Sequence, residues 1–135
     1  MAFFNWTDKL SVGIKAVDDD HKKLVEMLNS LYEAMKSGQG KEALGKVLDR
    51  LIGYTQFHFA REESFFAKTA YPGAAAHIKE HQDLVAQATT LQSRQKSGEI
   101  ALTIETLDFL KDWLNHHILE TDKQYSPHLN ASGIR

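Results

Sequence analysis

The feature that most constrains the fold is the division of the chain into four helix-forming segments by three short breaks. The breaks contain glycine or proline, which end helices, and they are KSGQGK (36–41), TAYPG (69–73) and KSGE (96–99). The segments between them are rich in Leu, Ala, Lys, Glu and Gln, and none alternates apolar and polar residues for long. We therefore predict helices over about 18–37, 41–66, 74–96 and 100–120.

Short connections between helices make neighbouring helices antiparallel. The sequence thus predicts an all-α, up-down-up-down antiparallel four-helix bundle, with an irregular N-terminal arm and a short C-terminal tail, YSPHLNASGIR. A chain of 135 residues is long enough for one core and short for two, so we expect a single domain over residues 1–135.

Composition excludes several classes of function. The net charge of -2, with acids and bases interspersed, gives no basic patch for nucleic acid. No apolar run approaches the roughly 20 residues of a membrane span, and no signal peptide is recognisable, so we expect a cytoplasmic protein. Cysteine is absent, so any metal must be bound through nitrogen and oxygen.

Each predicted helix has an apolar seam of residues three and four apart, and each seam continues into histidine. The histidines are His21 on the first, His58 on the second, His77 and His81 on the third and His117 on the fourth; Glu62 also continues the second. One such histidine is more often an ordinary core residue. Burying five with a carboxylate and no partners would cost several kcal/mol each. In an alternating bundle all six lie at the same end, where a metal centre would satisfy them together.

The other two histidines and one acidic neighbour lie off these seams. His116 is about 100° around the helix from His117, and His128 follows Pro127 in the tail. We expect solvent or outer hydrogen-bonding roles for both histidines. Glu63, one step from the seam, is expected to be only a neighbour of Glu62.

The ligand types favour a pair of transition metals. Five histidines exceed the needs of one four-coordinate zinc, and calcium and magnesium prefer oxygen. Iron accepts mixed imidazole and carboxylate ligands. Ferritin-like di-iron oxidases use Glu-x-x-His pairs, and this chain contains none. The low carboxylate content favours reversible binding over oxidation. Two metals also need bridges: Glu62 is one candidate, and spacing does not decide between Glu120 and Asp122 for the other, since Asp122 is about 140° from His117 on a regular helix.

The sequence resembles the hemerythrin family, specifically the single-domain bacteriohemerythrins. The matching motifs lie in the family order over nearly the whole chain, and they are WTDKLSVGI (6–14), DDDH (18–21), HFAREE (58–63), HIKEH (77–81) and WLNHHILETD (113–122). One departure is Asp20, where the family often has Gln or Glu; it affects outer hydrogen bonding and removes no ligand.

The resemblance implies a centre of two irons, Fe2+ or Fe3+ according to state, joined by an oxo or hydroxo group. It assigns one iron to His77, His81 and His117 and the other to His21 and His58, with Glu62 and Asp122 as bridges. It further implies that dioxygen binds reversibly at the two-histidine iron, where it is held as hydroperoxide, in a protein that stores, transports or delivers oxygen. By this resemblance the protein is not an enzyme.

An apolar pocket would protect bound oxygen, and Leu114, one turn before His117, is our candidate for lining it. We expect structural roles for Trp6, which would pin the N-terminal arm, and for Trp113 beside the bundle. The expected partners are dioxygen and an oxygen-consuming enzyme, and we expect a monomer. The alternatives are a di-iron oxidase or peroxidase and an oxygen or redox sensor module.

Overall fold

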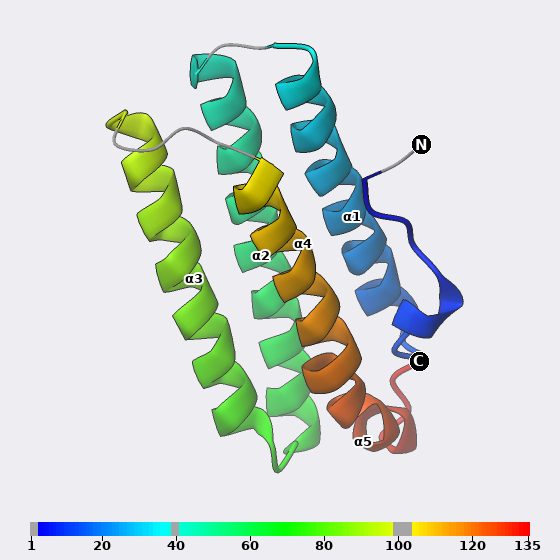
Figure 1. Ribbon diagram of the computed structural model, residues 1–135. Coiled ribbons are helices and arrows are strands. Elements are labelled where there is room, and N and C mark those ends of the chain that lie inside the picture. The colour runs from blue at the N-terminus through cyan, green and yellow to red at the C-terminus, as the bar shows by residue number, and fades with distance from the viewer. Residues whose placement is uncertain (1–2, 39–40, 99–103) are drawn as a thin grey trace.

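The described part of the chain, residues 3–38, 41–98 and 104–135 of a computed structural model, is dominated by four long antiparallel helices (Figure 1). These helices are α1 (Lys15–Lys36), α2 (Lys41–Thr69), α3 (Ala74–Lys96) and α4 (Ile104–His116). No strand occurs among the described residues. The predicted all-α four-helix bundle is confirmed.

The C-terminal part of the bundle is more divided than the expected helix to about residue 120 with a short tail after it. After α4 the backbone widens into a π-helical turn, η2 (His117–Thr121), and then tightens into a 3-10 helix, η3 (Asp122–Tyr125). A short α-helix, α5 (Ser126–Ala131), follows. The short tail that the sequence predicts is therefore largely helical. Pro127 lies in the first turn of α5, where proline's missing N–H costs no hydrogen bond.

The other helix boundaries moved by only a few residues. α1 begins three residues earlier than expected, at Lys15, and α2 continues to Thr69. The predicted start of the fourth helix at residue 100 lies outside the described residues.

The N-terminal arm packs along α1 and is held by side chains at two points. Asn29 on α1 accepts a hydrogen bond from the Phe4 N–H at 2.8 Å and donates one to the Phe4 carbonyl at 2.7 Å. Trp6 is half-buried against the core, with the Lys22 ammonium 5.3 Å from its ring centre. Phe4, which is buried, therefore anchors the arm more deeply than Trp6.

The arrangement brings particular helix ends together. The start of α1, the turn between α2 and α3, and α5 lie at one end of the bundle, the lower end in Figure 1. All the histidines on the apolar seams belong to this end. None of the described helices is both long and apolar enough to cross a membrane.

Candidate metal centre

The seven predicted ligands lie together inside this end of the bundle. Each is at most 3% exposed, and the set comprises His21, His58, Glu62, His77, His81, His117 and Asp122. Their ligand atoms form two groups in which all atoms lie within 4.8 Å of one another. One group has three histidines (His77, His81, His117) and the other has two (His21, His58). Glu62 and Asp122 belong to both groups.

Asp122 lies between the two groups and presents one oxygen to each. Its Oδ2 is 3.0 Å from His21 Nε2. Its Oδ1 is 3.0 Å from both His77 Nε2 and His117 Nε2. This arrangement suits a carboxylate that spans two cations.

Glu62 uses its oxygens differently. Its Oε1 is 3.2 Å from His58 Nε2 and 3.2 Å from His81 Nε2, so a single oxygen faces both groups. The other oxygen, Oε2, accepts a hydrogen bond from the hydroxyl of Tyr125, which is fully buried. Sequence reasoning missed Tyr125 because it placed residue 125 in the short tail after the fourth helix.

The π-helical turn explains how Asp122 reaches the centre. On a regular α-helix Asp122 would lie about 140° from His117. In a π-helix the hydrogen bonds join residues five apart, so residues five apart stack on one face. His117 begins this turn and Asp122 follows it directly, and both side chains are buried. Glu120, the alternative that spacing left open, is instead exposed and pairs with His116 at 3.2 Å.

The chemistry of the donor set fits metal cations. Buried atoms without a protein hydrogen-bond partner among the described residues include the Nε2 atoms of all five histidines, Glu62 Oε1 and both Asp122 oxygens. Such atoms are costly unless something binds them. Two ligand atoms about 2.1 Å from one transition-metal ion and at right angles lie about 3.0 Å apart. The observed nitrogen–oxygen separations of 3.0 and 3.2 Å match that spacing.

The electrostatics of the cluster also call for positive charge. Burial raises the pKa of Asp122, but the positive charge of His117 and the close imidazole nitrogens of the surrounding histidines outweigh it and hold the pKa well below its usual range. Burial likewise lowers the pKa of His58 and of His117, but the carboxylates Glu62 and Asp122 respectively reverse this and raise them to about 9 and about 10. In the absence of a cation, protons on imidazole neutralise the two carboxylates. A metal ion would take the place of those protons.

Three outer carboxylates hold three of the histidines in the tautomer that exposes Nε2. The Nδ1 N–H of His58 donates to Asp20 at 2.9 Å, that of His81 to Glu63 at 3.0 Å, and that of His117 to Glu80 at 2.6 Å. A carboxylate can only accept at these distances, so Nδ1 carries a proton and Nε2 is the nitrogen that would bind a metal once it has released its own proton. The expectation that Glu63 is only a neighbour was therefore wrong.

These outer carboxylates share one position in the sequence and one kind of partner in the structure. Each is adjacent in sequence to a predicted ligand: Asp20 to His21, Glu63 to Glu62, and Glu80 to His81. Each nevertheless bonds a histidine on the following helical segment. An acidic residue next to a predicted ligand is therefore a sequence signal for a carboxylate that hydrogen-bonds a histidine of the centre.

Asp20 is the most heavily bonded of the three. Besides His58 it accepts a hydrogen bond from the Tyr54 hydroxyl at 3.0 Å. Arg61 Nε lies 2.8 Å from its Oδ2. Burial raises the pKa of Asp20, but the bond to His58 and the other contacts outweigh it and lower the pKa.

The off-seam histidines and the aromatic residues take outer positions. His116 is exposed, and His128 Nε2 lies 2.8 Å from the Thr69 carbonyl. Trp113 does more than pack beside the bundle, because its ring stacks on that of His117 at 5.2 Å. Phe59 stacks on His81 with ring centres 3.7 Å apart. These aromatic rings cover the three-histidine group with apolar surface.

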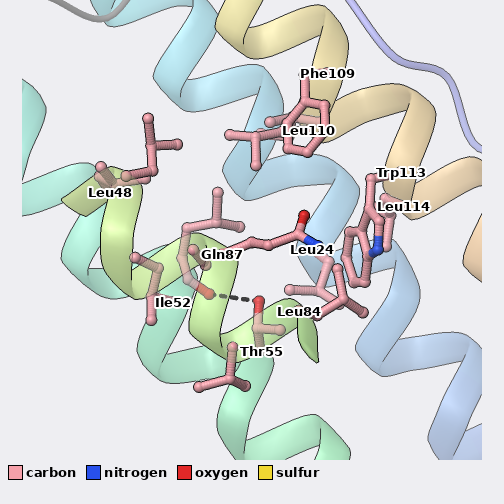
Figure 2. Close-up of a pocket in the computed structure, with 15 residues that line it drawn as sticks. Leu24, Leu48, Ile52, Thr55, Leu84, Gln87, Phe109, Leu110, Trp113 and Leu114 are labelled. Carbon is pink, nitrogen blue, oxygen red and sulfur yellow. Dashed lines mark hydrogen bonds between the residues drawn. The ribbon is translucent and has the colours of Figure 1, made fainter. Parts of the chain in front are cut away.

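Leu114 is buried, lies one turn from His117, and lines an apolar cavity inside the bundle (Figure 2). The predicted residue thus lies between His117 on one side and this cavity on the other.

The fold and site together define a class: a four-helix bundle with a buried histidine and carboxylate centre suited to two cations. A family model described as the hemerythrin HHE cation binding domain matches residues 12–129. The chain belongs to the hemerythrin family.

Curated relatives and solved structures agree with this placement. The chain is 38% identical to a bacteriohemerythrin of Methylococcus capsulatus over 97% of this chain and 100% of the relative. It is 31% identical to a bacteriohemerythrin of Clostridium acetobutylicum, over 90% and 98% respectively. A crystal structure of wild-type hemerythrin superposes with a TM-score of 0.90 at 36% identity, covering 95% of this chain and 98% of that one.

Proposed function

We propose that this protein is a non-haem di-iron protein that binds dioxygen reversibly, for oxygen storage, transport or delivery. The observation that carries the proposal is the pair of unequal histidine groups that share two carboxylates. His77, His81 and His117 would fill one iron, and His21 and His58 would leave a position open on the other. Iron bound there supplies the electrons that dioxygen binding requires.

The chain's own residues would provide the rest. Asp20, Glu63 and Glu80 orient the imidazoles, which fixes the lone pairs that face the metals. Leu114 and the surrounding apolar side chains would keep water from the bound gas. Every one of the seven ligand side chains is buried, which supports a site closed to bulk solvent.

The decisive experiment is a cycle of oxygenation on the iron-loaded protein. The protein would be reduced without air, exposed to oxygen, and then placed under vacuum. A visible absorption band that appears with oxygen and disappears without it, over repeated cycles, is the expected result. Irreversible oxidation at the first exposure, or rapid oxygen consumption with a reductant, would contradict reversible binding and favour a di-iron oxidase or peroxidase.

A further inference from the structure

The outer carboxylate of the two-histidine group differs in its surroundings from those of the three-histidine group. The side chain of Asp20 is 5% exposed, whereas those of Glu63 and Glu80 are 34% and 37% exposed. Water can therefore solvate the charges of Glu63 and Glu80, but groups of the protein must balance the charge of Asp20. The identity of those groups decides how strongly Asp20 attracts the proton of its histidine.

Two side chains of α2 contact Asp20 besides His58. Arg61 Nε lies 2.8 Å from Asp20 Oδ2, the same oxygen that accepts the Nδ1–H of His58 at 2.9 Å. The Tyr54 hydroxyl donates to the other oxygen, Oδ1, at 3.0 Å. Burial, together with the bond to Asp20, raises the pKa of Tyr54 to about 12, so the hydroxyl keeps its proton. Tyr54, His58 and Arg61 are spaced four and three residues apart, which places them on one face of α2.

His58 is the residue through which Asp20 can act on the two-histidine group. The other histidine of this group, His21, has no hydrogen-bond partner at Nδ1 within the described part of the chain. The three-histidine group, by contrast, receives support from both Glu63 and Glu80. A change at Asp20 will therefore act on the metal position that His58 would fill.

The pull of a carboxylate on the Nδ1 proton sets how well an imidazole donates electrons at Nε2. A carboxylate whose charge is not balanced draws this proton towards itself, and the ring becomes a more basic ligand. A cation beside the same carboxylate oxygen weakens the pull. A stronger donor favours ferric over ferrous iron, because ferric iron carries the larger positive charge.

We propose that Arg61 and Tyr54 are positioning residues that act through Asp20: they limit the electron donation of His58 and so favour the ferrous state at the two-histidine position. The part that concerns iron rests on the proposed function. The effect on the hydrogen bond of His58 does not, and it can be measured separately.

The hydrogen bond of His58 can be measured on zinc-loaded protein. Zn2+ accepts nitrogen and oxygen ligands, is not redox-active and is diamagnetic, so proton NMR can detect the Nδ1 proton of His58. We expect Arg61→Met and Tyr54→Phe each to move this signal downfield, because Asp20 then has fewer partners and accepts more strongly from His58. The signal of His81 should not move. An unchanged His58 signal in both variants would overturn the proposal and leave reversible oxygenation untouched.

The reduction potential of the iron-loaded protein, measured without oxygen, tests the consequence for the metal. Arg61→Met should lower the potential and make spontaneous oxidation in air several-fold faster. Tyr54→Phe should act in the same direction but less, since it removes no charge, and Arg61→Lys should restore most of the wild-type behaviour. Tyr32→Phe is the matched control, because Tyr32 stacks on Phe3 in the N-terminal arm. Unchanged potentials in the folded, iron-loaded Arg61 and Tyr54 variants would refute the link to the metal.

Loss of a positive charge can also lower the potential directly through space, so the role of Asp20 needs its own test. Asp20→Asn removes the charge that Arg61 balances. In that background Arg61→Met should change the potential much less than it does in the wild type, which is the result of a double-mutant cycle for coupled residues. An equal change in both backgrounds would overturn the action through Asp20.

Failure of the proposed function would look different from failure of this inference. If the wild-type protein does not bind oxygen reversibly but the variants still shift the His58 signal of the zinc-loaded protein, the proposed function fails and the hydrogen-bond network stands.

Discussion

At the scale of single residues, the two shared carboxylates differ in what holds them. Asp122 gives one oxygen to each histidine group, so the ligands themselves fix it. Glu62 directs one oxygen to both groups and relies on Tyr125 for the other. Burial raises the pKa of Tyr125 well above its ordinary value, as do the nearby charges of Glu62 and Asp122. The tyrosine therefore stays a hydrogen-bond donor at every physiological pH.

Removing this donor should weaken the centre without removing a ligand. We expect Tyr125→Phe to lower the free energy of unfolding by about 1.5–3 kcal/mol, the usual worth of a hydrogen bond to a charged group. We also expect a chelator to extract iron faster. Tyr71→Phe, which alters a half-buried ring in contact with Tyr125, is the control. Equal iron loss in both variants would show that general packing, and not the bond to Glu62, is responsible.

The ligand assignment itself is open to a simple comparison. His77→Ala or Glu62→Ala should lower the iron bound per chain substantially, because each removes a buried atom that faces the other ligands. His116→Ala should change it little, since that side chain is exposed. Iron would be measured by elemental analysis of the purified variants. An equal fall in all three variants would refute the assignment.

At the scale of helices, the three outer carboxylates link one helical segment to the next. Asp20 on α1 bonds His58 on α2, and Glu63 on α2 bonds His81 on α3. Glu80 on α3 bonds His117, the first residue after α4. Glu80 also accepts a hydrogen bond from Thr121 at 2.9 Å, within the π-helical turn. Each histidine thus receives its outer carboxylate partner from a different helix and not from its own.

Neutralising one of these carboxylates should reduce metal affinity. We expect Glu80→Gln to weaken iron binding by about 10–100-fold, the usual effect of losing an outer partner of a metal-bound histidine. Competition with a chromogenic chelator would measure it. Glu120→Gln is the matched control, because the Glu120 side chain is exposed and pairs with that of exposed His116. A loss of affinity equal in the control would point to surface charge instead.

The sequence predicts the regular helices better than it predicts the irregular backbone that follows α4. Apolar seams at helical spacing predicted α1 to α3 closely, because side-chain periodicity follows directly from the backbone turn. The π-helical turn depends on which backbone carbonyl accepts the hydrogen bond from each N–H, and residue spacing in the sequence does not show this. Spacing alone consequently left Glu120 and Asp122 undecided. Glu63 and Glu80 were missed for a different reason: their partners lie on another helix.

At the scale of the whole molecule, the buried charges make stability depend on both pH and metal. Without metal, the pKa of His58 is raised from 6.5 to about 9 and that of His117 to about 10 by the carboxylates, against the effect of burial. A raised pKa in the folded state adds stability that is fully present below about pH 6.5 and is lost as the pH rises through the folded values.

The thermal midpoint of the metal-free protein should accordingly fall between pH 6.5 and pH 10. The iron-loaded protein should show a smaller fall over the same range and a higher midpoint throughout, because the metals replace the protons and bind only the folded state. Circular dichroism melts of both forms would measure this. A midpoint independent of pH in the metal-free protein would contradict the raised pKa values of His58 and His117.

The adjacency of ligands and outer carboxylates has a mechanical consequence. A rotation of α2 about its own axis would move Glu62 and Glu63 together. It would therefore displace both a carboxylate shared by the two histidine groups and the hydrogen-bond partner of His81 on α3. The same holds for α1 through Asp20 and for α3 through Glu80. None of these three helices can rotate without disturbing a histidine on the next helical segment. The rotation of these helices about their own axes and the geometry of the metal centre are therefore coupled, so a change in one changes the other.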